Sequence, residues 1–268
     1  MLWRKGWWET RWEFSTLLGL TLLLVALHEP WEQPDLTRRA LWFQRYEPEL
    51  DENTRRFVTL LITYSGYVWN RWFGFYLPLI WSPCAIMMAT TLIKSSCPMM
   101  KGPQGAAGFF TSSLPVSRRK PLLTHSAVVA IEMILIALVP SLMYTIAIRL
   151  TGGEVPLGST VIYALLLALG GMVLVAFTFL LMIIFNSQWK ALTIGIFIAL
   201  ALRLPSHLSY RLPASLHEEY PWWHIYHVMS GETYFRYGRI PWLGLLASLA
   251  VSALIMFAAV RIYERRDF

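Results

Sequence analysis

Six apolar runs constrain the fold of this chain more than any other feature of its sequence. The hydrocarbon core of a bilayer is about 30 Å thick and is crossed by about 20 apolar residues in a helix. The runs therefore predict an all-α membrane protein with six transmembrane helices. They cover about 12–28, 72–93, 122–150, 156–185, 191–204 and 240–263, and the first and fifth are short.

The composition supports the membrane prediction. Only 15% of the residues are charged and 56% are hydrophobic, whereas soluble domains are about 25% charged. The 13 Trp and 12 Tyr residues fit as well, because amphipathic rings gather at the headgroup level. The net charge of +7 comes from scattered bases without a basic stripe, which favours a membrane surface over nucleic acid as the partner.

The distribution of basic residues predicts the orientation. Six spans put both termini on one side of the membrane. With the N-terminus inside, all five lysines of the chain fall on the cytoplasmic side, as the positive-inside rule requires. We therefore expect cytoplasmic N- and C-termini. Segments 29–71 and 205–239 then lie outside, the first as a loop or cap and the second as an aromatic-rich segment that dips back toward the membrane.

The N-terminal segment 1–13, MLWRKGWWETRWE, predicts an interfacial helix. Trp3, Trp7 and Phe14 share one helical stripe, and Trp8 and Trp12 form a second. A helix rich in Trp and Arg beside a span suits a position in the plane of the interface. A plain extension of the first span is the alternative.

The loop 94–120 contains the most distinctive short segment, FFTSSLPVSRRK at 109–120. Pro115 ends any preceding helix and Ser117 can cap the helix that follows, so the turn is stiff. Its apolar side chains suit a hydrophobic groove on a partner, and its bases suit acidic residues or lipid phosphates; a positive-inside anchor is the alternative for the bases. The candidate coupling residues are Phe109, Phe110, Leu114, Pro115, Val116, Ser117, Arg118 and Arg119.

Four features in this order resemble the permease subunit of an ABC-2 type transporter. They are the Trp- and Arg-containing N-terminal segment, LPVSR after the second span, the aromatic stretch before the last span, and the terminal RIYERRDF. The region KGPQGAAGFFTSS lacks the acidic residue that precedes LPVSR in many members. The resemblance implies one transmembrane permease domain over 1–268, with an elbow helix and a type V exporter-like fold.

The same resemblance implies the partners and the function. It implies two permeases, identical or sister chains, carried on two cytoplasmic ABC ATPase subunits in a bacterial plasma (inner) membrane. The expected function is ATP-driven export of an amphiphilic cargo, such as a drug, a peptide, a lipid or a glycan. An accessory permease for cofactor or metal-centre assembly, and an intramembrane enzyme that uses Glu132 and His125, are the alternatives.

The chain itself has no nucleotide-binding motif. GxxxxGK[ST] does not occur, and the 27-residue loop 94–120 is too short to fold an ATPase domain. ATP and Mg²⁺ are therefore expected on the partner chain, and this chain is expected to be no enzyme and to hold no cofactor. Cys84 and Cys97 are expected to be free thiols.

Glu132 and His125 are the candidate residues of a translocation path. Glu132 lies twelve residues beyond Lys120, which is about 18 Å along a helix and well inside the bilayer. Carboxyl groups at that depth are costly and usually face a bundle interior or a wet cavity. His125 lies seven residues earlier on the same face. A contact to a cationic cargo or a proton site is one interpretation, and a neutral Glu bonded to a neighbouring helix is the other.

The outer segment 205–239 holds four histidines and several acids. They lack the tight spacing of a metal motif and are surrounded by aromatic residues. Polar tips at the membrane interface are the favoured interpretation, and no metal is expected. The residues are His207, His217, His224 and His227, with Glu218 and Glu219.

Overall fold

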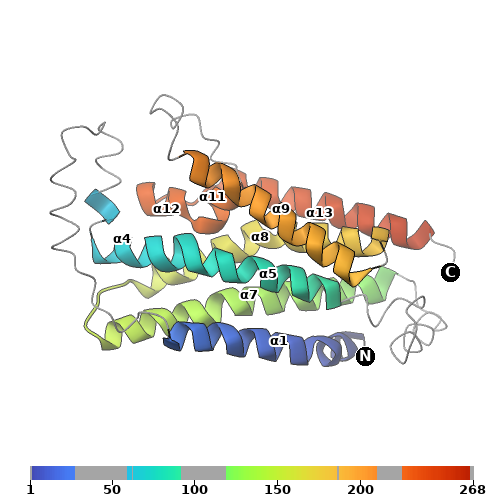
Figure 1. Cartoon of the computed structure of the whole chain (residues 1–268), viewed down its shortest axis with the longest axis horizontal. Helices are drawn as coiled ribbons and strands as arrows, with labels where there is room; N and C mark the ends of the chain where they lie inside the picture. Colours follow the sequence, from blue (N-terminus) through green and yellow to red (C-terminus); the bar gives the residue numbers. More distant parts are fainter. Residues whose placement is uncertain are drawn as a thin grey trace.

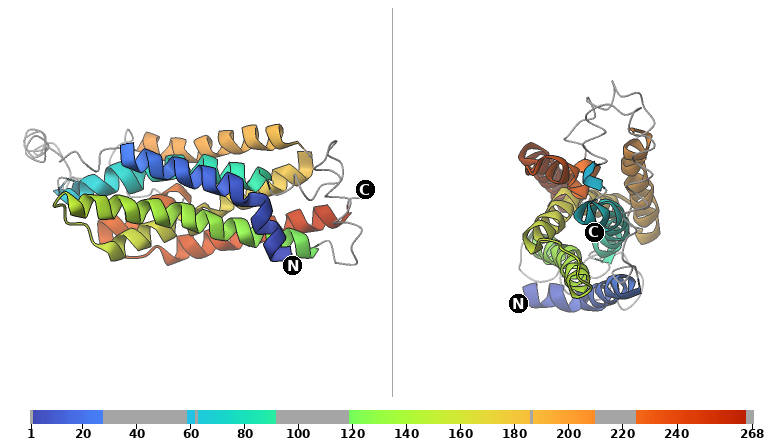
Figure 2. Two further views of the ribbon diagram at one scale, coloured as in Figure 1. Left: turned by 90° about the horizontal axis from the view of Figure 1, so that it is seen from below. Right: turned by 90° about the vertical axis from the view of Figure 1, so that its left-hand side faces the viewer.

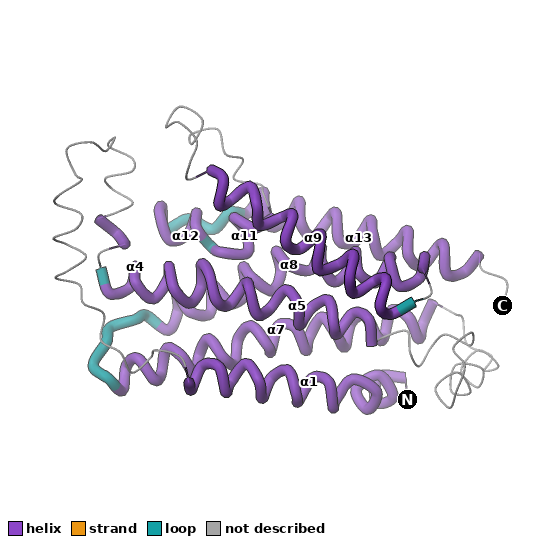
Figure 3. Tube along the Cα trace, in the orientation of Figure 1, coloured by secondary structure: helices purple, strands orange, loops and turns teal. Residues whose placement is uncertain are grey.

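A computed structural model of the chain describes residues 2–27, 59–61, 63–91, 119–185, 187–209 and 225–265. Within these ranges the backbone is helical apart from short turns and contains no strand (Figure 3). Five helices are long and apolar enough to cross a membrane. The prediction of an all-α, multi-pass membrane protein is thus confirmed at this level.

The helices lie side by side along the long axis of the molecule, and both termini lie at the same end (Figure 1). Helix α7, which follows the loop 94–120, begins at this same end of the molecule. The order is α1 (Leu2–Leu27), α4 (Tyr64–Val68), η2 (Trp69–Tyr76), α5 (Leu77–Thr91), α7 (Arg119–Leu150), α8 (Leu157–Phe185), α9 (Gln188–Ser209), α11 (Ile225–Ser230), α12 (Glu232–Tyr237) and α13 (Trp242–Arg265).

Helix α8 forms the centre of the bundle and packs against α5, α7, α9, α11 and α13. It has no charged residue, so every face can be buried without an ion-pairing partner. Its Gly171 leaves room for the ring of Trp81 on α5, where a Cβ atom would collide with the indole. The Nε1 of Trp81 in turn donates to the carbonyl of Met133 on α7 at 3.0 Å. Trp81 of α5 thereby contacts both Gly171 of α8 and Met133 of α7, and so connects the three helices.

Helix α1 contains both N-terminal segments that we predicted as separate elements. The predicted interfacial helix 1–13 and the first span are one helix, Leu2–Leu27, with a bend near its N-terminus (Figure 2). Much of α1 is long enough and apolar enough to count as a membrane span, Trp3–Leu27. The interfacial position of its first turns stays a prediction.

The second membrane-crossing rod begins at Tyr64, eight residues before the predicted start at 72, and consists of α4, η2 and α5. The expected outer segment 29–71 therefore includes the first turns of this rod. The hydroxyl of Thr63 accepts a hydrogen bond from the N–H of Gly66 at 3.1 Å and caps the rod. Its middle part, η2, is a π-helix, a form that is rare and often found at functional sites.

Helix α9 is longer than the apolar run 191–204 that predicted it, at 22 residues. Its described apolar part, Gln188–Ala201, is shorter than a membrane span requires by length alone. Nevertheless α9 runs along the bundle beside α5 and α8 (Figures 1 and 2). The other predicted spans agree with α7, α8 and α13 to within three residues at each end.

Two short helices, α11 and α12, precede α13 in the chain and form a hairpin. Val228, Met229 and Ser230 of this hairpin are buried, and Val228 packs against Gly170 of α8. Trp69 of η2 donates its Nε1 hydrogen to the Ser230 carbonyl at 3.0 Å. Gly231, with φ of 65°, makes the turn between the two helices, a conformation that suits glycine. The hairpin is therefore part of the packed bundle.

Candidate functional site

The interface between α1 and α7 contains the most deeply buried carboxyl group among the described residues. Glu132 of α7 is fully buried, at 0% exposure. The hydroxyl of Thr10 on α1, itself 1% exposed, lies 2.6 Å from Oε1 of Glu132. We call this interface the α1–α7 seam, and define it by Gly6, Glu9, Thr10, Glu13, His125, Val128 and Glu132.

Residue spacing on α1 explains how the seam forms. Gly6, Thr10 and Glu13 recur every three or four residues and so share one face of the helix. A Cβ atom at Gly6 would lie 3.3 Å from Cγ2 of Val128, so the glycine lets the two backbones approach closely. This close approach brings the short Thr10 side chain within reach of Glu132.

A second polar contact lies about two helical turns from Glu132, toward the start of α7. Nε2 of His125 pairs with the carboxylate of Glu9 on α1, and Nζ of Lys5 lies 3.5 Å from the same carboxylate. His125 is 5% exposed, whereas the side chain of Glu9 is 21% exposed. The structure therefore places His125 and Glu132 on the same interface, but gives each its own partner on α1.

Two polar atoms of the seam are left unsatisfied. Among the described residues, Oε2 of Glu132 and Nδ1 of His125 have no hydrogen-bond partner, and both are inaccessible. Such buried atoms are rare and ask for an explanation. Glu13 lies on the α1 face that meets Glu132, and its charge acts on that carboxyl group. The seam thus holds several acidic groups and little to neutralise a charge at Glu132.

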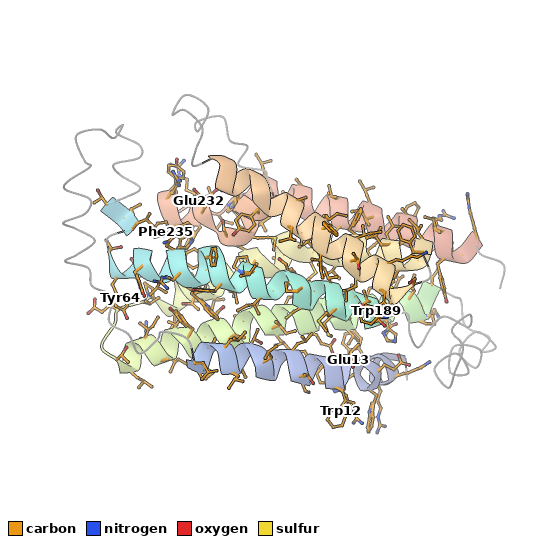
Figure 4. All side chains as sticks on the ribbon, in the orientation of Figure 1. Trp12, Glu13, Tyr64, Trp189, Glu232 and Phe235 are labelled. Carbon is orange, nitrogen blue, oxygen red and sulfur yellow. The ribbon has the colours of Figure 1, made fainter. Side chains whose placement is uncertain are left out.

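The opposite face of α1 has a different character. Trp8 and Trp12 are 51% and 70% exposed, and Figure 4 shows Trp12 pointing away from the bundle. The guanidinium of Arg11 lies 3.7 Å from the centre of the Trp8 ring and 5.4 Å from that of Trp12. Such cation–π pairs keep the charge near an aromatic surface, as expected of a helix face that meets lipid headgroups.

One of the predicted coupling residues is described. Arg119, the first residue of α7, pairs with Glu264 in the last turn of α13. This ion pair connects the end of the loop 94–120 to the end of the last helix. Phe109, Phe110, Leu114, Pro115, Val116, Ser117 and Arg118 lie outside the described residues.

One of the outer histidines, His227, belongs to an ion cluster in the hairpin. Its Nδ1 lies 2.6 Å from Oε2 of Glu232, and Nη2 of Arg236 lies 2.5 Å from Oε1 of the same carboxylate. Burial opposes the charged form of Glu232, but the hydrogen bond from His227 and the charges of His227 and Arg236 outweigh it and lower the pKa of Glu232. The cluster thus stabilises a buried carboxylate.

No group of three metal-ligating side chains occurs in the described part of the chain. His207, His217, His224, Glu218 and Glu219, which the sequence analysis considered as ligands, have side chains outside the described set. Cys84 is a buried free thiol, and Cys97 lies outside the described residues.

An apolar hollow of about 150 Å³ lies between α1 and the second rod. It is lined by Leu24, Leu27, Trp72, Tyr76 and Ile80. The Trp72 ring stacks on Tyr144 of α7, with centroids 4.6 Å apart. The indole N–H of Trp72 is buried without a partner among the described residues. The hollow is separate from the α1–α7 seam.

The sequence analysis missed the α1 side of the seam, namely Glu9, Thr10 and Glu13. The tryptophan stripes of 1–13 predict a helix in contact with lipid, and they do not indicate what its third face contacts. The signal was present, because Gly6, Thr10 and Glu13 form a small and polar stripe in a helix that is otherwise aromatic.

A family model matches the C-terminal part of the chain. The family described as "Protein of unknown function (DUF2705)" matches residues 115–268, which is more than half of the chain. The matched part begins at Pro115 of the LPVSR segment and includes α7 to α13. No curated protein and no solved structure matches the chain.

Proposed function

The chain belongs to the DUF2705 family, and we propose that it is the permease subunit of an ATP-driven exporter of ABC-2 type. In this proposal it forms half of a translocation path with a second permease, identical or sister. Two copies of a separate cytoplasmic ABC ATPase supply the energy. The expected cargo is amphiphilic, and the expected location is a bacterial plasma membrane.

The observation that carries the proposal is the position of Arg119, which the sequence places directly after LPVSR. Arg119 begins α7, at the end of the bundle where both termini lie. Its side chain pairs with Glu264 near the end of α13. A push on Arg119 would therefore reach two membrane helices at once, which is the property that coupling to a partner ATPase requires.

Two further observations support a six-span permease with both termini on one side. An odd number of crossings would leave the termini at opposite ends of the bundle, whereas they lie at the same end (Figure 1). Counting α9 as a short crossing gives six. The buried hairpin α11–α12 also occupies the place before the last span where ABC-2 permeases have short re-entrant helices.

The contacts in the seam bear on the alternative of an intramembrane enzyme. A general base and its partner need a hydrogen bond to act together. Here His125 pairs with Glu9 and Glu132 with Thr10, so the two candidate catalytic residues are engaged separately. In this arrangement His125 and Glu132 do not form a catalytic pair.

The proposal is tested by purifying the tagged chain in a mild detergent and measuring the native mass of the complex. We expect two permeases with two copies of an ATP-binding protein, and ATP hydrolysis that Leu114→Asp or Arg118→Glu suppresses. Arg239→Gln, an exposed substitution next to the hairpin, serves as the control and should have no effect. Recovery of the folded chain without an ATPase would overturn the proposal.

A further inference from the structure

The hydrogen-bond contacts of the α1–α7 seam favour a neutral Glu132. The Thr10 hydroxyl lies 2.6 Å from Oε1 of Glu132 and 3.2 Å from the carbonyl oxygen of Gly6. A hydroxyl has one hydrogen to donate, and a carbonyl oxygen can only accept. Both contacts are full hydrogen bonds when Glu132 donates to Thr10 and Thr10 donates to Gly6, whereas an ionised Glu132 would have to share the single Thr10 hydrogen with the Gly6 carbonyl.

The other oxygen of Glu132 leads to the same conclusion. Oε2 is buried, and none of the described residues offers it a hydrogen bond. An ionised carboxylate would leave part of its charge on this atom without compensation, which is among the most costly arrangements in a protein interior. The carbonyl oxygen of a neutral acid costs far less when it is left without a donor.

The surrounding charges do not compensate an ionised Glu132. The titratable groups of α1 are Arg4, Lys5, Glu9, Arg11 and Glu13; Lys5 lies against Glu9, and the guanidinium of Arg11 lies over the Trp8 ring. Besides Glu132, those of α7 are Arg119, Lys120, His125, Tyr144 and Arg149; Arg119 pairs with Glu264 of α13, His125 pairs with Glu9, and Arg149 donates to the Val155 carbonyl. The other titratable groups on the elements packed against α7 are Cys84 of α5, Tyr163 of α8, and Arg261, Tyr263 and Arg265 of α13.

We propose that Glu132 is a proton-binding site whose occupancy holds α1 against α7. With the proton bound, the chain of hydrogen bonds from Glu132 to Thr10 to Gly6 is complete and the seam closes. Loss of the proton leaves a carboxylate that the closed seam cannot solvate, so α1 must part from α7 to admit water. The ligand of this site is a proton, and the site would stand without the proposed transport function.

The geometry of Gly6 and Val128 provides a direct reporter of seam closure. A Cβ atom at Gly6 would lie 3.9 Å from Cβ of Val128, within the range of about 3.5–4.5 Å that a disulfide needs. Gly6→Cys with Val128→Cys, on a background with Cys84→Ala and Cys97→Ser, should therefore cross-link α1 to α7 when the seam is closed.

The experiment measures the cross-linking rate against pH, with and without Glu132→Gln. Glutamine has the shape of the neutral acid and cannot ionise. Because thiols react faster at high pH, the rate is expressed relative to that of the Glu132→Gln protein at the same pH. We expect this ratio to fall by up to about tenfold per pH unit once Glu132 titrates. A ratio that does not change with pH overturns the proposal.

A second pair of cysteines controls for changes elsewhere in the bundle. Thr145 of α7 and Thr160 of α8 have hydroxyl oxygens 2.8 Å apart, and the pair lies away from the seam. Thr145→Cys with Thr160→Cys should give a ratio independent of pH. If this ratio falls in parallel, the whole bundle has loosened and the effect is not specific to Glu132, which also overturns the proposal.

Infrared spectroscopy reads the proton itself and does not depend on cross-linking. At neutral pH the wild-type protein should show the carbonyl stretch of a protonated carboxylic acid, shifted in D₂O and lost in Glu132→Gln. Absence of such a difference band shows that Glu132 is ionised and overturns the proposal. Neither readout needs the ATPase, so a negative result here is distinct from failure of the proposed transport function.

Discussion

The indole of Trp69 and the ring of Phe235 stack with centroids 4.4 Å apart and planes within 1° of parallel. Residues 166 positions apart in the sequence thereby fasten the hairpin α11–α12 to the π-helix η2. The hydroxyl of Tyr226 adds a hydrogen bond to the carbonyl of Gly74 at 2.9 Å. This carbonyl lies within η2, so a hairpin side chain binds directly to the π-helical backbone.

Removing the Tyr226 hydroxyl should loosen the hairpin. Tyr226→Phe leaves the Gly74 carbonyl without this donor, and we expect a loss of about 1 kcal/mol in stability. Tyr237→Phe is the matched control, because Tyr237 is 69% exposed. Hydrogen exchange at residues 225–237 is the measurement, and equal exchange in the two variants would contradict the assigned contact.

Acidification should release the same hairpin. The pKa of Glu232 is lowered from 4.5, because the hydrogen bond and charge of His227 and the charge of Arg236 outweigh burial. A lowered pKa in the folded state gives stability that is complete above the ordinary value and is lost as the pH falls through the folded pKa. Hydrogen exchange at 225–237, corrected for intrinsic rates, should therefore rise as the pH falls below the ordinary value of 4.5.

Two variants separate this effect from general acid unfolding. Glu232→Gln should raise exchange already at neutral pH and remove most of the pH dependence. Glu154→Gln, at an exposed position in the turn between α7 and α8, should keep the wild-type profile. A wild-type profile in Glu232→Gln would show that the cluster does not control the hairpin.

Adding one methyl group at Gly171 should destabilise the centre of the bundle. In Gly171→Ala the new Cβ atom collides with the ring of Trp81, which is fully buried. Overpacking of this kind costs about 1–3 kcal/mol. In Gly158→Ala, on the same helix, the Cβ atom meets nothing within 4 Å, and alanine should be neutral or stabilising. Thermal unfolding in detergent compares the two, and equal midpoints would contradict this packing.

Thr10 should matter to stability where Thr16 does not. Thr10→Val removes the partner of the buried Glu132 and should cost about 1–3 kcal/mol. Thr16 is on the same helix and bonds the Trp12 carbonyl at 2.7 Å, but it is exposed. Thr16→Val should therefore leave the unfolding midpoint almost unchanged. If both variants unfold at the same temperature, the contact between Thr10 and Glu132 does not stabilise the seam.

Reversing the charges of Arg119 and Glu264 should affect coupling more than stability. The pair is exposed, and exposed ion pairs contribute little to folding. If the chain is coupled to an ATPase as proposed, Arg119→Glu alone should reduce ATP hydrolysis by that complex, because it removes the ion pair between the start of α7 and α13. The double variant Arg119→Glu with Glu264→Arg should restore it. Failure of the double variant to recover would mean that Arg119 acts through another contact.

The membrane class and the approximate position of most helices could be predicted from the sequence. Runs such as 122–150 and 156–185 are long enough and apolar enough that no other structure satisfies their backbone in a bilayer. Their ends agree with α7 and α8 because charged or helix-breaking residues flank them. The depth of Glu132 followed from the same reasoning, since the rise per residue in a helix is fixed.

The contacts of the buried polar groups depend on tertiary packing. The sequence predicts that Glu132 lies inside the membrane, but which helix faces it depends on the packing of α1 against α7, through Gly6 and Val128. The π-helix η2 and its contacts with α11–α12 likewise depend on residues more than 150 positions apart. Such contacts join helices whose order in space is not set by local preference, because any apolar helix face can pack against several others.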